Sequence, residues 1–297
     1  MSTQAPQKPS SGRLDAELVR RGLARSRTQA AAHLKDGRVS VDGVVVTRSS
    51  TPVTADSVLT VQPDVDDPGF VSRAAFKLDG VLGALGDGGP PIAGAVCLDV
   101  GASTGGFTDV LLRRGARTVI ALDVGHDQLV PVLREDPRVV VMEKFNARQL
   151  TADDLPARPR VVVADVSFIS LTLILPALVR SVPRDADLLL MVKPQFEVGR
   201  ERLGHGGVVR SDALRGEAIR TVTTAAAAAG VGVRAVIPSP LPGPHGNREY
   251  FVWFTRAEGP IGPEDDTIER AVAHPLGATT VAHWAHATAT PTTGGRS

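Results

Sequence analysis

Apolar and polar positions in the first part of the chain follow two helical repeats and then an alternating pattern. The segment LDAELVRR places its apolar residues on one helical face and ends on Gly22, a residue typical of the position after a helix. Ser26 stands where the N-cap of a second helix is expected, before RTQAAAHLKDG. RVSV and VVV flank Asp42 and Gly43, a pair typical of a two-residue hairpin turn. Residues 12–62 are therefore predicted to form a small α+β domain of two helices and a hairpin.

Beyond a Pro/Gly/Asp-rich linker at residues 63–70, apolar runs alternate with amphipathic segments. Runs such as VCLDV, TVIALDV, VVVADV and DLLLMV are typical of buried strands, and segments such as GGFTDVLLRRG are typical of helices. This alternation predicts an α/β fold over residues 71–275, a Rossmann-like and mostly parallel sheet with helices on both faces. Ligands of such sheets bind at the carboxyl ends of the strands. The polar ends are expected to be a disordered tail at residues 1–11 and a poorly ordered C-terminal tail at residues 276–297.

Charge is unevenly distributed along the 297 residues. The whole chain has a formal net charge of +1, but residues 11–62 hold eight Lys and Arg against five Asp and Glu, a net +3. A basic module gains affinity for phosphates by releasing their counterions, so this segment fits a nucleic-acid partner. The competing interpretation is that these charges only solvate a surface.

The rest of the composition indicates a soluble, cytoplasmic protein. Hydrophobic residues make up 42% of the chain, enough for a sizeable core. Cys97 is the only cysteine, so no internal disulfide can form and a reducing compartment is expected. The N-terminal MSTQAPQKPSSG lacks the apolar core of a signal peptide, and no stretch approaches the roughly 20 apolar residues of a membrane span. The seven histidines form no metal-like cluster, so no metal partner is expected. No membrane partner is expected either, and a monomer is the preferred interpretation of an oligomeric state that the sequence leaves open.

The basic segment also resembles a known RNA-binding module. The string RLDAELVRRGLARSRTQAAAHLKDGRVSVDGVVV is similar to the S4 domain along nearly its whole length. This resemblance implies that the first domain binds RNA through its arginines. The candidate RNA-binding residues are Arg13, Arg20, Arg21, Arg25 and Arg27, together with Arg73 ahead of the first strand of the second domain.

A glycine-rich turn, LDVGASTGGF, includes the end of the first expected strand of the second domain. A dinucleotide fingerprint needs Gly-x-Gly-x-x-Gly, but Ala, Ser and Thr separate Gly101 from Gly105, so the spacing does not fit NAD. S-adenosylmethionine fits better. It has no pyrophosphate to cradle, and its amino-acid tail and sulfonium need close backbone approach with acidic groups nearby.

Side chains at the ends of the first three expected strands complete this candidate cofactor site. Asp123 is placed to accept the ribose hydroxyls and Asn146 to reach the adenine edge. The alternative is that Asp99 and Asp123 only cap the helices that follow them. The candidate cofactor-binding residues are Asp99, Gly101, Ser103, Thr104, Gly105, Gly106, Phe107, Asp123, Asn146 and Asp165.

Three classes of methyl transfer make different demands on the sequence. Exocyclic-amine methyltransferases stack the base on an Asn/Asp-Pro-Pro-aromatic loop, whereas the corresponding loop here is ADVSF, residues 164–168. Methylation of cytosine C5 needs a cysteine nucleophile, and Cys97 lies inside an expected strand. A ribose hydroxyl needs a base and groups that hold the ribose in line. The candidates for these roles are Lys77, Asp165, Lys193 and Glu249.

The order Lys-Asp-Lys-Glu resembles the tetrad of the FtsJ-like ribose 2′-O-methyltransferases, and its combination with an S4 domain resembles the TlyA family of ribosomal RNA methyltransferases. The strings VSRAAFKL, LDVGASTGGFTDVLL, VVADVSFISL, VKPQFEVG and PLPGPHGNREYF carry this resemblance. It implies that Lys193 is the base or proton acceptor and that the other three residues orient the ribose and tune Lys193. The implied substrates are cytidine 2′-hydroxyls in the RNA of the small and often also the large ribosomal subunit, with ribosomal RNA or ribosomal subunits as partners. Family members often carry glycines at the positions of Ala74 and Ala75.

Other interpretations lead to different tests. A ribosome assembly or RNA-binding factor with secondary methylation would keep its function in cells when catalysis is removed. A hemolysin, a label that this family has carried, would need a membrane-inserting segment, whereas SLTLILPALVRSV is expected to cover the sheet. A pseudouridine synthase also combines an S4 domain with a catalytic body but requires no S-adenosylmethionine. Taken singly, each tetrad residue could form an ordinary surface ion pair.

Overall fold

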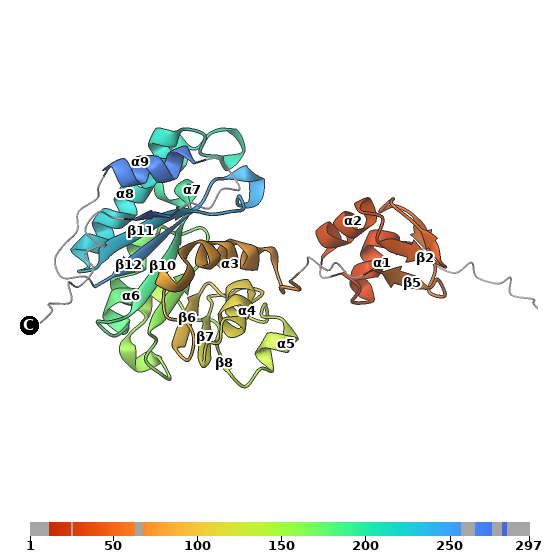
Figure 1. Ribbon diagram of the computed structural model, residues 1–297, viewed down its shortest axis with the longest axis horizontal. Coiled ribbons are helices and arrows are strands. Elements are labelled where there is room, and N and C mark those ends of the chain that lie inside the picture. Colours follow the sequence, from red (N-terminus) through yellow and green to blue (C-terminus); the bar gives the residue numbers. More distant parts are fainter. Residues whose placement is uncertain (1–11, 25, 63–67, 257–264, 275–280, 284–297) are drawn as a thin grey trace, which may run out of the picture. The chain divides into compact units, whose positions relative to one another are not determined.

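The computed structural model describes residues 12–24, 26–62, 68–256, 265–274 and 281–283 (Figure 1). The chain divides into two compact units, residues 1–69 and 70–297. Each unit has its own hydrophobic core, and the two are described separately. The expected tail at residues 1–11 and the candidate Arg25 lie outside the described residues.

The N-terminal unit packs two helices against short antiparallel strands. Its elements are β1 (Gly12–Arg13), α1 (Leu14–Arg20), α2 (Arg27–Lys35), β2 (Val39–Val41), β3 (Val44–Val45), β4 (Pro52–Val53) and β5 (Leu59–Val61). β2 lies between β3 and β5 in one sheet, and β1 pairs with β4. Buried residues from both helices and from the strands form the core, among them Leu14, Leu34 and Val53.

Local signals in the sequence set the boundaries of this unit. Ser26 Oγ accepts the backbone N–H of Gln29, as predicted for the N-cap of α2. Gly22 follows α1 with a φ of 71°, a conformation that favours glycine. The β2–β3 hairpin turns at Asp42 and Gly43, with φ of 51° and 82°, as a two-residue turn requires.

An eight-stranded sheet forms the centre of the second unit. Its strands are β6 (Val96–Val100), β7 (Thr118–Leu122), β8 (Val139–Met142), β9 (Val161–Ala164), β10 (Asp187–Val192), β11 (Gly232–Pro238), β12 (Tyr250–Thr255) and β13 (Ala282–His283). They lie in the order β13-β11-β12-β10-β9-β6-β7-β8. Strands β6 to β10 are parallel, whereas β12 is antiparallel to both of its neighbours. The predicted mostly parallel sheet is confirmed.

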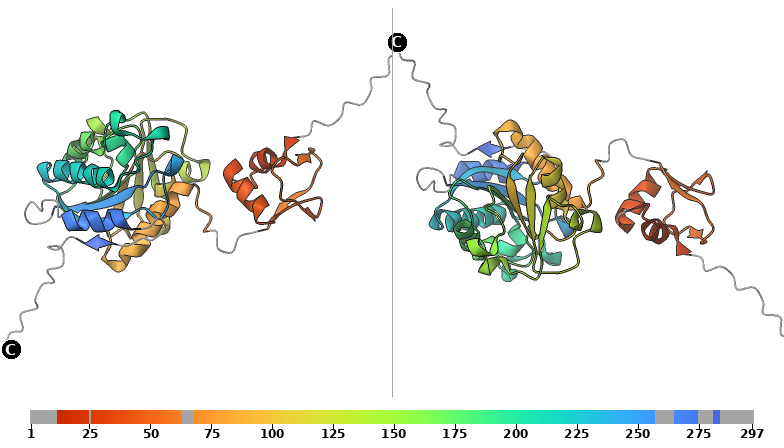
Figure 2. Two further views of the ribbon diagram at one scale, coloured as in Figure 1. Left: turned by 90° about the horizontal axis from the view of Figure 1, so that it is seen from above. Right: turned by 90° about the horizontal axis from the view of Figure 1, so that it is seen from below.

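Helices cover both faces of this sheet (Figures 1 and 2). On one face, α3 (Arg73–Leu85), α4 (Gly106–Arg113) and α5 (Pro131–Arg134) share a core with alternate strand residues such as Cys97 and Val119. On the other face, α6 (Leu175–Ser181), α8 (Asp212–Ala228) and α9 (Asp265–Ala273) pack on the intervening residues, such as Leu98 and Ile120. A short helix, α7 (Pro194–Glu197), directly follows Lys193 at the end of β10.

Two elements differ from the predicted pattern. The expected helix SLTLILPALVRSV is a 3₁₀ turn (Leu171–Leu173) followed by α6, because Pro176 suits the first turn of an α-helix and not its interior. Within the expected tail at residues 276–297, β13 pairs with β11, whose outer edge offers backbone hydrogen bonds to two more residues. Among the described residues, no helix combines the length and the apolar character that a membrane span requires.

Candidate active site

A pocket of about 280 Å³ opens beside the glycine-rich turn of the second unit. Its walls come from the start of α3, the turn after β6, the loops after β9 and β10, and Pro242. The predicted site residues that line it are Lys77, Gly101, Ser103, Thr104, Gly106, Phe107, Asp165, Lys193 and Arg73. The structure therefore brings most of the predicted cofactor and catalytic residues to one place.

Close backbone packing around the turn explains its glycines. Gly101 has a φ of 83°, and a Cβ there would lie 2.7 Å from the carbonyl oxygen of Asp165. Gly106 opens α4 where a Cβ would overlap Ser72 Oγ at the start of α3. Gly105 does not line the pocket; a Cβ there would meet the side chains of Leu133 in α5 and Leu129 in the loop before it. The glycines thus let three other segments touch the turn.

Two of the predicted acidic residues bond to the glycine-rich turn or to the helix that follows it. Asp99 is fully buried, and its Oδ2 accepts the Thr108 hydroxyl at 2.7 Å. Burial raises the pKa of Asp99 to about 7, and its Oδ1 has no hydrogen-bond partner. Asp123 Oδ2 accepts the backbone N–H of Ser103 at 2.8 Å, and its Oδ1 accepts that of Gly125 at 2.7 Å. Neither side chain lines the pocket.

Asn146 is not brought to the pocket wall. It caps a short 3₁₀ turn after β8, where its Oδ1 accepts the backbone N–H of Arg148 at 3.1 Å. Its side chain is exposed, so the structure leaves its predicted contact with adenine as a prediction.

The four tetrad residues form two lysine–carboxylate pairs. Lys193 Nζ lies 2.5 Å from Asp165 Oδ1, and Lys77 Nζ lies 2.6 Å from Glu249 Oε2. The sheet explains this meeting, because the ends of the parallel β9 and β10 and the start of the antiparallel β12 share one edge. Lys77 and Glu249 are both buried, and α3 carries Lys77 across to that edge.

Polar residues that the sequence did not single out contact these pairs or connect the loops that carry them. Lys193 Nζ also donates to Ser167 Oγ at 2.9 Å, and Gln195 Nε2 donates to Glu249 Oε1 at 3.3 Å. Glu197 joins the loop after β9 to α7, since its carboxylate accepts the Ser170 hydroxyl at 2.5 Å and the backbone N–H of Leu171 at 2.9 Å. Burial raises the pKa of Glu197. The only sequence signal was position, because all of these residues flank a tetrad member.

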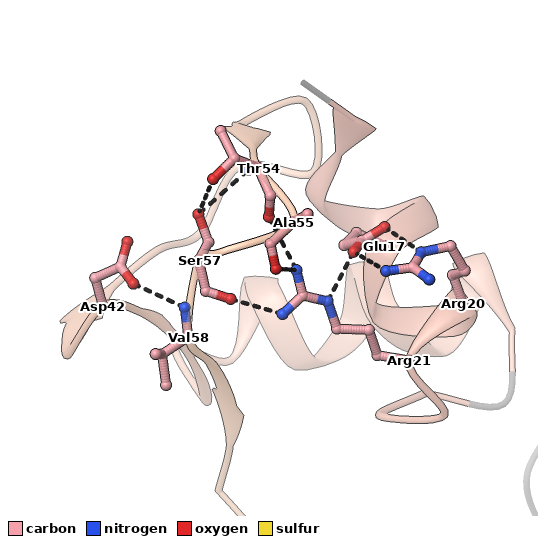
Figure 3. A network of polar contacts seen from close by, with 8 residues as sticks. All are labelled: Glu17, Arg20, Arg21, Asp42, Thr54, Ala55, Ser57 and Val58. Atoms are coloured by element: carbon pink, nitrogen blue, oxygen red, sulfur yellow. Dashed lines mark hydrogen bonds and ion pairs between the residues drawn. The ribbon is translucent and has the colours of Figure 1, made fainter. Parts of the chain in front are cut away.

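Four of the predicted RNA-binding arginines of the first unit are held by two carboxylates. Arg13 and Arg27 both bind Asp15, and Arg20 and Arg21 both bind Glu17. The Arg21 guanidinium also donates to the carbonyl oxygens of the 54–57 loop, at 2.6 to 3.1 Å (Figure 3). Of the two arginines on Glu17, Arg20 is the exposed one, whereas Arg21 ties the loop to α1.

Arg73 has a different setting, at the pocket of the second unit. Its Nη2 donates to the carbonyl oxygen of Pro242 at 3.3 Å, and both residues line the pocket. Within the described part of the chain, no group of three His, Cys, Asp or Glu side chains is arranged to hold a metal ion.

Comparison with known proteins agrees with this geometry. The FtsJ-like methyltransferase family matches residues 70–256, and the S4 domain matches residues 12–59. Over 267 residues the chain is 50% identical to the "16S/23S rRNA (cytidine-2'-O)-methyltransferase TlyA" of Mycobacterium tuberculosis, a match that covers 88% of this chain and 97% of the relative. The chain belongs to the TlyA family. The predicted family and the S4 plus Rossmann-like fold are thereby confirmed.

Other members related to this TlyA-family chain carry a different name. "Hemolysin A" of Brachyspira hyodysenteriae is 38% identical over 246 residues, 82% of this chain and 99% of the relative. A solved structure named "Putative hemolysin from Streptococcus thermophilus" superposes with a TM-score of 0.70 at 35% identity, covering 89% of this chain and 95% of that one. Proteins similar to this chain over most of its length thus carry both names.

Proposed function

We propose that this protein transfers the methyl group of S-adenosylmethionine to the ribose 2′-hydroxyl of cytidine in ribosomal RNA, in the small subunit and also in the large one. The observation that carries the chemistry is the meeting of two lysine–carboxylate pairs at the pocket beside the glycine-rich turn. The 50% identity to a relative named for 16S and 23S rRNA supports the choice of substrate.

The pocket residues fit S-adenosylmethionine. Gly101 and Gly106 line the pocket, and their lack of a side chain lets the loop after β9 and the start of α3 pack against the turn that the ligand would meet. Ser72 Oγ is buried beside Gly106 without a hydrogen-bond partner, so it can bind a polar group of the ligand. Ser72, Gly101, Ser103 and Thr104 would hold the cofactor. When bound, it supplies an electrophilic methyl group on a sulfonium.

Lys193 is the proposed acceptor of the hydroxyl proton. An oxygen that forms a new bond to carbon must release its proton, and Nζ of Lys193 is the group proposed to take it. Asp165 Oδ1 at 2.5 Å and Ser167 Oγ at 2.9 Å fix the position of this nitrogen at the pocket wall. Asp165 then stabilises the ammonium that forms.

Lys77 is proposed to orient the ribose. Its ammonium has three N–H donors, of which one is directed to Glu249. The remaining donors can bind a ribose oxygen, because Lys77 lines the pocket. Glu249 is fully buried as a side chain and keeps the ammonium in place, and Gln195 in turn holds the other oxygen of Glu249. The S4 unit would bind the RNA outside this site.

The test is methyl transfer from labelled S-adenosylmethionine to 30S and 50S subunits and to their naked RNA, followed by nucleoside analysis. Wild type is expected to form 2′-O-methylcytidine, and Lys193→Ala to lose it by about 10²-fold or more while binding of the cofactor persists. Lys193→Arg keeps the charge but cannot accept a proton, so it should fail as well. Arg158→Ala, an exposed cation outside the pocket wall, is the control. Label on a base, or full activity of Lys193→Arg, would refute the proposal.

A further inference from the structure

One buried carboxylate in the first unit carries two exposed arginines. Asp15 Oδ1 accepts Arg13 Nε at 3.1 Å, and Oδ2 accepts Arg13 Nη2 at 3.3 Å. The same Oδ2 accepts Arg27 Nη2 at 2.8 Å and Nε at 3.2 Å, and the backbone N–H of Ala16 donates to Oδ1 at 3.0 Å. A single carboxylate thus joins the residue before α1 to the first residue of α2.

Exposure and charge make this cluster suitable for an anion. The Asp15 side chain is only 7% exposed, whereas those of Arg13 and Arg27 are 53% and 61% exposed. Each guanidinium has five N–H donors and uses two of them on Asp15, so three on each are left for a ligand. Two positive charges on one negative charge leave the cluster at +1. Guanidinium forks match the geometry of phosphate oxygens.

The neighbouring cluster on Glu17 also joins two arginines to one carboxylate, but one of its arginines binds a loop of the protein. Glu17 also binds two arginines, and hydrogen bonds from its arginines lower its pKa to about 2, as those of Arg13 and Arg27 do for Asp15. There, however, Arg21 directs its remaining donors to the 54–57 loop (Figure 3). Only the Asp15 cluster presents two exposed guanidiniums on one carboxylate among the described residues of this unit.

We infer that Asp15 is a positioning residue for RNA binding, which holds Arg13 and Arg27 together as one site for a phosphate of the RNA backbone. The inference rests on the proposed function, because it assumes that the S4 unit binds RNA. Free arginine side chains must lose rotamer freedom when they bind. Arginines that are already held on Asp15 have lost much of it, so a phosphate binds them more tightly.

If charge alone mattered, removal of the Asp15 carboxylate would strengthen RNA binding, whereas a positioning role predicts weaker binding. This difference makes the inference testable. Removal of any negative charge from the RNA-binding face should strengthen binding, since phosphates repel carboxylates. Asp15→Asn should nevertheless weaken binding, because the guanidiniums are no longer held. Asp36→Asn is the matched control: Asp36 is exposed at the end of α2, and its substitution changes the charge of the unit by the same amount.

The experiment measures the affinity of the full-length protein for a ribosomal RNA fragment over a series of salt concentrations. Asp15→Asn is expected to lose about tenfold in affinity. The slope of log affinity against log salt concentration should also become shallower by about 0.7 to 0.9, the contribution of one phosphate contact. Asp36→Asn should bind as wild type or more tightly. In methyl transfer, Asp15→Asn should raise KM for RNA and leave kcat and the affinity for S-adenosylmethionine unchanged.

A second variant separates positioning from folding. Arg27→Lys leaves Asp15 intact and keeps the charge but loses the fork, so it should show the same weaker binding and shallower salt dependence. In the double variant Asp15→Asn/Arg27→Lys, the second substitution should add little. Binding by Asp15→Asn as tight as by Asp36→Asn, or fully additive losses in the double variant, would overturn the inference. Methylation of a base would refute the proposed function, whereas this comparison of affinities would stand.

Discussion

Lys77 Nζ lies 2.6 Å from Glu249 Oε2, although 172 positions of sequence separate the two residues. The pair spans the second unit from its first helix to its antiparallel strand, and both side chains are buried. Removal of one partner from a buried pair leaves an uncompensated charge, whereas replacement of both partners does not. The pair is therefore expected to matter for stability as well as for the reaction.

Glu249→Gln should lower the free energy of unfolding by about 3 kcal/mol, because it leaves the Lys77 ammonium buried without its counter-charge. The double variant Lys77→Met/Glu249→Leu should be more stable than Glu249→Gln, although it is inactive. Urea unfolding followed by tryptophan fluorescence measures both. A double variant no more stable than the single one would contradict a buried ion pair here.

Substitutions where α3 meets α4 should lower the affinity for S-adenosylmethionine and leave the affinity for RNA unchanged. Ser72→Ala removes a buried hydroxyl that has no partner in the protein, so protein stability should change little and the affinity for S-adenosylmethionine should fall. Gly106→Ala should lower both protein stability and the affinity for S-adenosylmethionine, because a Cβ there overlaps Ser72 Oγ. Ser72→Ala/Gly106→Ala should regain part of the stability. Calorimetric titration with S-adenosylmethionine tests these effects, and unchanged affinity of Ser72→Ala would exclude a role of the hydroxyl in binding.

Asp99 should make stability depend on pH. Burial raises its folded-state pKa to about 7 from 3.8, so the folded state keeps a proton that the unfolded chain has released. Stability is therefore lost as pH rises from about 4 to about 7, and the loss is complete above that. Asp99→Asn does not titrate, so its stability relative to wild type should rise over this window. The exposed Asp153→Asn is the control, and a constant difference from pH 4 to 8 would show that Asp99 does not titrate there.

Replacement of Arg20 and of Arg21 by Ala should have different effects on stability and RNA binding, although the two residues are adjacent and share Glu17. Arg21→Ala removes three bonds to backbone carbonyls and should cost the first unit about 2 kcal/mol of stability. Arg20→Ala removes one exposed ion pair and should cost less than about 1 kcal/mol, while it weakens RNA binding. Hydrogen exchange of residues 12–62 in the full-length protein reports stability. Equal protection in both variants would contradict the distinction.

Local signals were sufficient to predict much of the fold. Ser26, Gly22 and the Asp42-Gly43 turn act within a few residues, so the helices and hairpin of the first unit could be located from the sequence. The meeting of the tetrad could also be expected, because strand ends of a parallel sheet share one edge.

Contacts between distant segments could not be predicted. Nothing near Arg21 in the sequence indicates that it binds the 54–57 loop, and nothing near Gly106 indicates that it touches Ser72. The bond of the Asn146 side chain to the backbone N–H of Arg148 was likewise not predicted, and the role of Asn146 toward adenine stays a prediction. Such outcomes depend on which segments pack together, and periodicity carries no information about that.

The single cysteine has a practical consequence. Cys97 is fully buried in β6, and burial raises the pKa of its thiol to about 12, so little thiolate exists near neutral pH. Maleimide dyes, which react with thiolates, should leave the native protein unlabelled. One new cysteine at an exposed position such as Val44 or Leu173 would then accept a fluorophore without background. The wild-type chain therefore needs no cysteine removed before a single fluorophore is attached at a chosen position.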